Sequence, residues 1–138
     1  MAKPLKLLCG SILTTLLSLD AAATEPRGVL LPTSEVADGM QRVAIVGGSY
    51  FFRPEHIVVK AGQGLELAVR MEPGIIPHRF VLETASGKSL ADVSIGETAK
   101  VLRLDLPAGK YLFHCPNRLL FFKSHRERGM AGVLEVRE

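Results

Sequence analysis

Four side chains in the second half of the chain could together bind a metal ion: His78, Cys115, His125 and Met130. The chain has one other cysteine, Cys9, and it lies in an apolar N-terminal stretch that is typical of a secretory leader. An exported cysteine without a disulfide partner serves as a metal ligand, as a redox group or as a link to a second protein. Here a thiolate, imidazoles and a thioether form a soft donor set, which suits copper.

Each donor type has its own chemical role at a copper ion. A thiolate bonds covalently to copper and provides an electron path, imidazoles stabilise both oxidation states, and a thioether is a weak axial donor that favours Cu(I). Two imidazole nitrogens and a thiolate in a trigonal plane, with a distant thioether on the axis, make a blue-copper site. The four residue types therefore predict a one-electron centre.

Each residue also has an ordinary structural interpretation. Cys115 could be a small buried hydrophobic residue at a strand end, as many free cysteines are. His78 could be a loop histidine, and Met130 could be a core residue. Ligation is favoured because all four residues, His125 included, lie where predicted strands begin or end, so that one end of a sandwich can gather them.

Three further residues with donor atoms are assigned other roles. His114 alternates with Cys115 along a strand and should face the opposite side, as a non-ligand at the surface or beside the electron path. His56 is interpreted as a surface residue. Met71 is interpreted as a packing residue and is the reserve ligand if the site is rich in sulfur.

Short β segments separated by turn residues fill the chain from about residue 41 onward. They are expected at residues 43–46, 57–59, 65–70, 78–83, 100–104, 111–115 and 132–136, with an edge strand at 29–31. The pattern predicts an all-β fold, a Greek-key antiparallel β-sandwich of seven or eight strands. Residues 85–95 are expected to be mainly loop, and residues 117–127 could carry a short helix.

The N-terminal region predicts export of the protein. Residues 1–23 combine two lysines, an apolar stretch and a run of three alanines, which is typical of a cleaved signal peptide. The alternative is an N-terminal membrane anchor, but the apolar stretch is shorter than the ~20 residues that a spanning helix needs. We expect an extended arm at residues 24–40, one domain at 41–138 and a periplasmic location. The full-chain charge of +3 is too weak to indicate nucleic-acid binding.

Several segments of the chain resemble the cupredoxin family, the plastocyanin- and azurin-like copper proteins. The matching segments are F-R-P at 52–54, I-V-V-K-A-G at 57–62, P-H at 77–78, L-P-A-G-K-Y at 106–111, F-H-C at 113–115 and H-R-E-R-G-M-A-G at 125–132. The resemblance implies a cupredoxin-like sandwich with one copper ion, held by His78, Cys115 and His125 in the equatorial plane and by Met130 on the axis. The family usually has a much shorter segment between the cysteine and the second histidine than residues 116–124.

The apolar run Leu119, Leu120, Phe121 and Phe122 lies within this longer segment. It could be a cap that packs on the sandwich and shields the metal, or an apolar surface on which a redox protein docks beside His125. Four basic residues flank the run, with Glu127 as the only acidic residue among them: Arg118, Lys123, Arg126 and Arg128. These charges are either a solvated face or a means of steering an acidic partner.

The sequence therefore predicts a periplasmic electron carrier with a mononuclear copper site, which transforms no substrate and exchanges electrons with a redox protein. A copper-delivery or copper-handling protein is the alternative, because a long and pliable loop would release the metal more readily. An enzyme is a weaker hypothesis, because no general base or second copper-ligand set is evident. A metal-free interaction module is also weaker, because all four ligand types occur in order.

Overall fold

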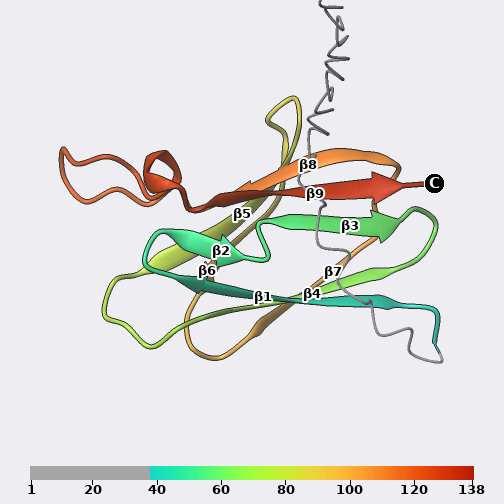
Figure 1. Ribbon diagram of the computed structural model, residues 1–138, viewed down its shortest axis with the longest axis horizontal. Coiled ribbons are helices and arrows are strands. Elements are labelled where there is room, and N and C mark those ends of the chain that lie inside the picture. Colours follow the sequence, from blue (N-terminus) through green and yellow to red (C-terminus); the bar gives the residue numbers. More distant parts are fainter. Residues whose placement is uncertain (1–37) are drawn as a thin grey trace, which may run out of the picture.

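The computed structural model describes residues 38–138. The predicted leader, the predicted edge strand at 29–31 and most of the predicted arm lie outside the described residues. The described chain forms two β-sheets that face each other (Figure 1), so the predicted β-sandwich is confirmed. Nine strands are present in this part of the chain, slightly more than predicted. Among residues 38–138, no helix has the length and hydropathy needed to span a membrane.

The two sheets differ in size. The smaller sheet contains, in spatial order, β2 (Phe51–Arg53), β1 (Gln41–Gly48), β4 (Leu65–Met71) and β7 (Lys100–Leu104). The larger sheet contains β3 (His56–Lys60), β9 (Ala131–Arg137), β8 (Gly109–His114), β5 (His78–Thr84) and β6 (Ser89–Ile95). Strand β4 shows why these segments fold as they do, because its burial alternates along the strand and apolar side chains face the opposite sheet.

Some strand-level predictions are wrong. The sheets are not wholly antiparallel, since β1 pairs in parallel with β4 and β3 pairs in parallel with β9. Residues 89–95 were expected to be loop but form β6, an edge strand whose mostly exposed side chains give little hydrophobic pattern. Strand β2 was not predicted. The helix expected within residues 117–127 is only a 3-10 turn, η1 (Arg126–Arg128).

Three buried phenylalanines form the centre of the core beneath one end of the sandwich. The Phe80 and Phe113 rings stack with centroids 5.5 Å apart, and Phe52 meets both rings edge to face. All three side chains are almost completely buried, which contributes roughly 1.5–3 kcal/mol each. Phe80 and Phe113 lie on neighbouring antiparallel strands, so the start of β5 and the end of β8 are held at the same end of the sheet.

Candidate metal centre

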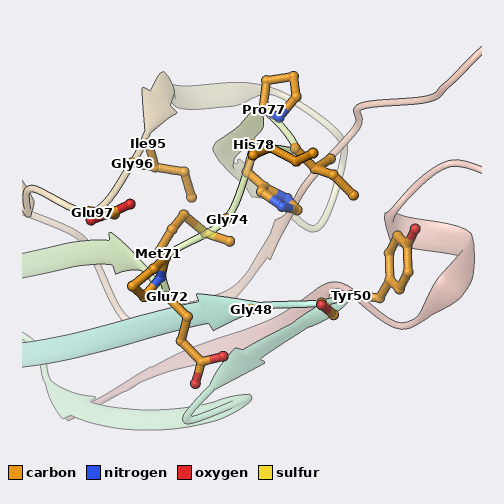
Figure 2. A pocket seen from close by; sticks show the side chains of 14 residues that line it. Gly48, Tyr50, Met71, Glu72, Gly74, Pro77, His78, Ile95, Gly96 and Glu97 are labelled. Atoms are coloured by element: carbon orange, nitrogen blue, oxygen red, sulfur yellow. The ribbon is translucent and has the colours of Figure 1, made fainter.

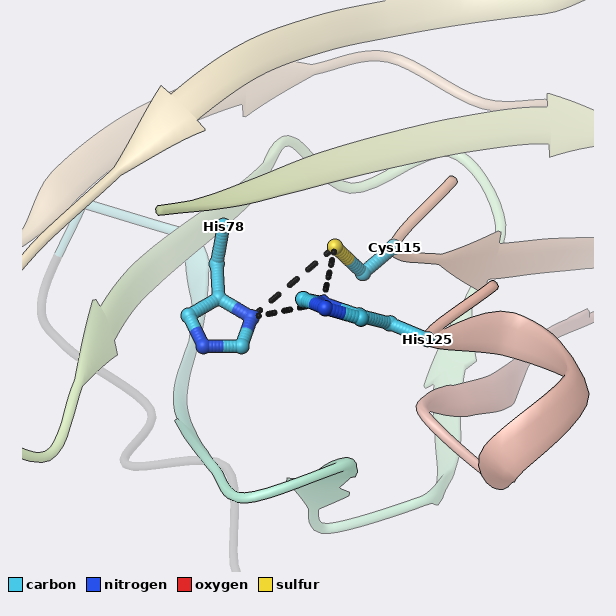
Figure 3. A group of neighbouring side chains, drawn as sticks. All are labelled: His78, Cys115 and His125. Carbon is cyan, nitrogen blue, oxygen red and sulfur yellow. Dashed lines mark hydrogen bonds between the residues drawn. The ribbon is translucent and has the colours of Figure 1, made fainter. Parts of the chain in front are cut away.

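Three donor atoms meet at this end of the sandwich (Figure 3). Cys115 Sγ lies 3.4 Å from His125 Nδ1 and 3.9 Å from His78 Nδ1, and the two Nδ1 atoms are 3.2 Å apart. The point equidistant from the three atoms lies about 2.0 Å from each, close to the lengths of roughly 2.0–2.3 Å that first-row metals adopt with these donors. The structure therefore brings three of the predicted ligands together with the spacing of a single metal site.

The protonation of the two imidazoles also suits metal binding. Burial lowers the pKa of His78, and the nearby His125 adds to this shift. Burial likewise lowers the pKa of His125, with a further contribution from the positive charge of Arg128. Both rings are neutral near pH 7, so each can offer a nitrogen lone pair to a metal. Cys115 is a free, fully buried cysteine, and with two imidazoles it forms a donor set suited to one copper ion.

The positions of His78 and Cys115 follow from the sheet. His78 begins β5, and Cys115 immediately follows β8. Two residues along each strand, on the same face, lie Phe80 and Phe113, whose stacked rings fix the two strand ends. The Arg79 backbone N–H also donates to Cys115 Sγ at 3.4 Å, and such a bond from outside the ligand set stabilises a thiolate and orients it.

His125 is positioned by a capping box that the sequence analysis missed. Ser124 Oγ accepts a hydrogen bond from the Glu127 backbone N–H, and Glu127 Oε2 accepts bonds from the Ser124 backbone N–H and hydroxyl. The reciprocal Ser124–Glu127 bonds span the start of η1, in which His125 occupies the N-cap position, and Gly129 ends the turn with a left-handed φ of 107°. The signal was present in the sequence, since Ser and Glu three residues apart are the signature of a helix start.

Met130 lies fully buried between His125 and β9. Its backbone N–H donates to the His125 carbonyl, and its carbonyl accepts from the Cys115 backbone N–H, each at 3.0 Å. Gly132, two residues further on, permits the close packing of this segment, because a Cβ there would collide with the Phe113 ring and the Glu55 carbonyl. The backbone thus links Met130 to two of the converging ligands, while its role as an axial donor stays a prediction.

The other candidate donors lie outside the three-residue cluster. His114 faces the other side of β8 but is buried rather than exposed, with Nε2 3.4 Å from a Glu83 carboxylate oxygen. His56 lies beside Glu135, with 3.4 Å between the ring and the carboxylate, on a side chain that is partly exposed. Met71 is buried in the core, as predicted.

Two openings lead toward the cluster, and each is lined by a different histidine. A cavity of about 370 Å³ reaches His78 (Figure 2). It is lined by Met71 at the end of β4 and by the loop between β4 and β5, which includes Glu72 and Ile75. A smaller pocket of about 220 Å³ reaches His125 and is lined by Tyr50, Leu119, Phe122, Lys123 and Arg128. The ring of Tyr50 meets the His125 ring edge to face at 5.2 Å, and the Arg128 guanidinium lies 4.6 Å above the Tyr50 ring.

The apolar run at residues 119–122 projects from the body of the sandwich, in the orange loop at the left of Figure 1. Its four side chains are between 46% and 84% exposed, so the interpretation of the run as a packed cap is wrong. Only Leu119 and Phe122 contact the pocket above His125. Contiguous exposed apolar side chains of this kind are unusual on a monomeric surface.

No protein-family model matches this chain, and no curated protein matches it. Solved structures, in contrast, do match this chain. It is similar to auracyanin from Roseiflexus castenholzii at 17% identity, with 70% of this chain and 97% of that chain covered and a TM-score of 0.58. Auracyanin A from Chloroflexus aurantiacus is similar at 18% identity, with 72% of this chain and 100% of that chain covered and a TM-score of 0.58. Rusticyanin from Thiobacillus ferrooxidans is similar at 13% identity, with 76% of this chain and 86% of that chain covered and a TM-score of 0.55.

These similarities are structural, and they establish that the chain has the cupredoxin fold. The fold implied by the resemblance of the motifs is thereby confirmed. The buried cluster of His78, Cys115 and His125 lies at the end of this fold where loops and strand ends meet.

Proposed function

We propose that this chain is a periplasmic copper protein that carries single electrons. The observation that supports this function is the convergence of Cys115 Sγ and the Nδ1 atoms of His78 and His125 on one point. Met130 is assigned as the axial donor, since it is buried and its backbone is bonded to Cys115 and His125. A copper ion bound there would supply a Cu(II)/Cu(I) couple that takes one electron from a donor protein and passes it to an acceptor.

The surroundings of the donors fit a carrier that converts no substrate. Strand ends and a capped turn hold the three converging side chains, and the stacked Phe80 and Phe113 rings support them from below. Ligands held in this way keep similar positions in both oxidation states, which keeps the reorganisation on electron transfer small. Two of the similar structures, auracyanin A and rusticyanin, are described as copper proteins, which supports copper as the metal.

The periplasmic location rests on the leader predicted at residues 1–23 and on the state of Cys115. A free thiol in an oxidising compartment needs protection, and ligation of a buried thiolate provides it.

The partner is a redox protein with an acidic surface, which docks on the exposed residues 119–122. Arg118, Lys123, Arg126 and Arg128 flank this run in the sequence. Arg118 pairs with Glu127 and Arg126 with Glu83, so the attraction of an acidic surface is assigned to Lys123 and Arg128, which line the pocket at His125. Electrons pass at His125, because its pocket is bounded by Leu119 and Phe122 from the same run.

The test is addition of Cu(II) to the purified protein, followed by visible absorption, EPR and voltammetry. An intense thiolate-to-copper band with reversible one-electron cycling is expected for the wild type, and Cys115→Ala should lose the band. His56→Gln is a matched control, since His56 lies outside the cluster and this variant should retain the band. Absence of the band in the wild type, or its persistence in Cys115→Ala, would overturn the ligand assignment.

Copper delivery is the second candidate. One similar structure is the metal-binding domain of a Cu(I)-exporting P-type ATPase from Streptococcus pneumoniae, with Cu(I). The identity is 18%, 75% of this chain and 91% of that chain are covered, and the TM-score is 0.55. Rapid loss of copper to a chelator together with irreversible voltammetry would favour delivery over electron transfer.

A further inference from the structure

The two openings toward the cluster carry opposite charges. The cavity at His78 is bordered by Glu72 and Glu97, and no lysine or arginine among residues 38–138 lines it. The pocket at His125 is bordered by Lys123 and Arg128, and none of the acidic residues in the described part of the chain lines it. A cation that approaches this end of the molecule is attracted by one opening and repelled by the other.

Hydrogen bonds hold the acidic side of the cavity in place. The Met71 backbone N–H donates to the Gly96 carbonyl at 2.7 Å, which joins the end of β4 to the turn that carries Glu97. The Glu72 backbone N–H donates to the Gly47 carbonyl at 2.8 Å. The backbone that carries the two glutamates is therefore tied to the sheet, directly at Glu72 and through the neighbouring Gly96 at Glu97.

The order of side chains across the cavity suits a copper ion. In the view of Figure 2, Met71 lies between Glu97 and His78, and all three line the same cavity. Carboxylates attract a hydrated cation, imidazole nitrogen binds copper more strongly than carboxylate oxygen does, and a thioether is a soft donor that suits Cu(I). The cavity volume of about 370 Å³ also leaves room for an ion that still carries water.

We propose that copper reaches its ligands through the cavity at His78, with Glu72 and Glu97 steering the ion, while the opposite opening at His125 serves electron exchange. The inference rests on the proposed copper function and adds the route by which the metal is loaded. Loading and electron exchange then use different openings, which meet at Tyr50, a residue that lines both.

Stopped-flow absorption of the full-length protein in its metal-free form, mixed with Cu(II) chloride at low salt, tests this route. Neutralising both carboxylates in Glu72→Gln/Glu97→Gln should slow formation of the thiolate-to-copper band by about tenfold at roughly 0.01 M ionic strength. The final band should be unchanged, since neither side chain belongs to the ligand cluster. At high salt the difference should disappear.

The matched control is Asp105→Asn/Glu138→Gln, which changes the net charge equally at the other end of the sandwich. Asp105 follows Leu104, which pairs with Leu65 at the start of β4, whereas the cavity lies at the end of β4. Its uptake rate should stay within about twofold of the wild-type rate. A second test variant, Ile75→Lys, adds a positive charge at a fully exposed position of the cavity lining, where the core is not disturbed, and it should also slow uptake.

A normal band formed at the wild-type rate in Glu72→Gln/Glu97→Gln and in Ile75→Lys would overturn the route alone. Equal slowing in the control pair would also overturn it, because the effect would then follow net charge rather than this cavity. A wild-type protein that forms no band would instead overturn the proposed function and the route with it.

Discussion

The segment that supplies His78 and the segment that supplies His125 differ in almost every respect except the imidazole they deliver. The loop before His78 joins two strands directly and borders a cavity with acidic residues. The segment before His125 is longer, projects into solvent with an apolar run, and ends in a capping box surrounded by basic residues. Nevertheless both rings are buried, and both present Nδ1 to Cys115.

This difference separates two properties of the molecule. The positions of the His78 and Cys115 donor atoms depend on the strand ends and on the stacked Phe80 and Phe113 rings, whereas the position of His125 depends on the hydrogen-bonded turn of its own segment. The surface around each histidine depends on its loop, and loops can vary in charge and polarity without moving the donors. The sandwich therefore fixes two of the three converging side chains, and the two loops give their surroundings opposite charge.

The largest expected effect comes from removing part of the sandwich that supports both segments. Phe113→Ala should lower the free energy of unfolding by about 3–5 kcal/mol, because the ring is fully buried and stacks on Phe80. Phe122→Ala removes a ring of the same type that is 46% exposed, and it should change that free energy by about 0.5 kcal/mol or less. Urea denaturation measures both, and similar losses would show that the long loop is part of the stable core.

The next largest effect is on the rate of electron exchange, and it should follow only from changes at the pocket beside His125. Lys123→Gln/Arg128→Gln removes both basic side chains that line the pocket and should slow electron exchange at a carboxylate-coated electrode by roughly threefold to tenfold at low salt. Voltammetry gives the rate. Glu72→Gln/Glu97→Gln is the opposite-side control and should not slow this exchange. If Glu72→Gln/Glu97→Gln slows electron exchange as much as Lys123→Gln/Arg128→Gln does, electrons do not pass selectively at His125.

A smaller effect is expected from the capping box. Ser124→Ala removes the hydroxyl that accepts the Glu127 backbone N–H, and loss of such a cap costs about 0.5–2 kcal/mol. Hydrogen exchange should become faster at residues 125–130, where the amide of Met130 is bonded to the His125 carbonyl. Amides of β5 next to His78 should keep their protection. Faster exchange at both sites would mean that the two segments are not independent.

The smallest expected effect is the pH dependence of the stability of the turn that contains Ser124 and Glu127. Hydrogen bonds from Ser124 lower the pKa of Glu127 below its ordinary value of 4.5, with help from the charges of Arg118 and Lys123. A carboxylate with a lowered pKa stabilises the folded turn above pH 4.5, and this stabilisation is lost as the pH falls through the lower folded value. NMR of the His125 region should therefore report loosening below pH 4.5. Glu127→Gln should remove this pH dependence.

Much of the site was predictable from the sequence. His78, Cys115 and His125 are unusual donor types at predicted strand ends, and the structure brings them together as expected. The environment of the loop was less predictable, because an apolar run such as residues 119–122 is equally compatible with burial and with exposure. Strand β6 was missed for a related reason, since an edge strand with few buried side chains lacks a clear alternation.

The donor types, the β alternation and the turn residues can be read from the sequence, because they depend on side-chain chemistry and on local backbone preferences. How the donors converge and what surrounds them depends on the packing of the two sheets. The distances of 3.2–3.9 Å among the three donor atoms result from strands paired across long stretches of chain. The acidic and basic openings likewise combine residues distant in sequence, such as Glu72 with Glu97 and Tyr50 with Arg128, which no local pattern could bring together.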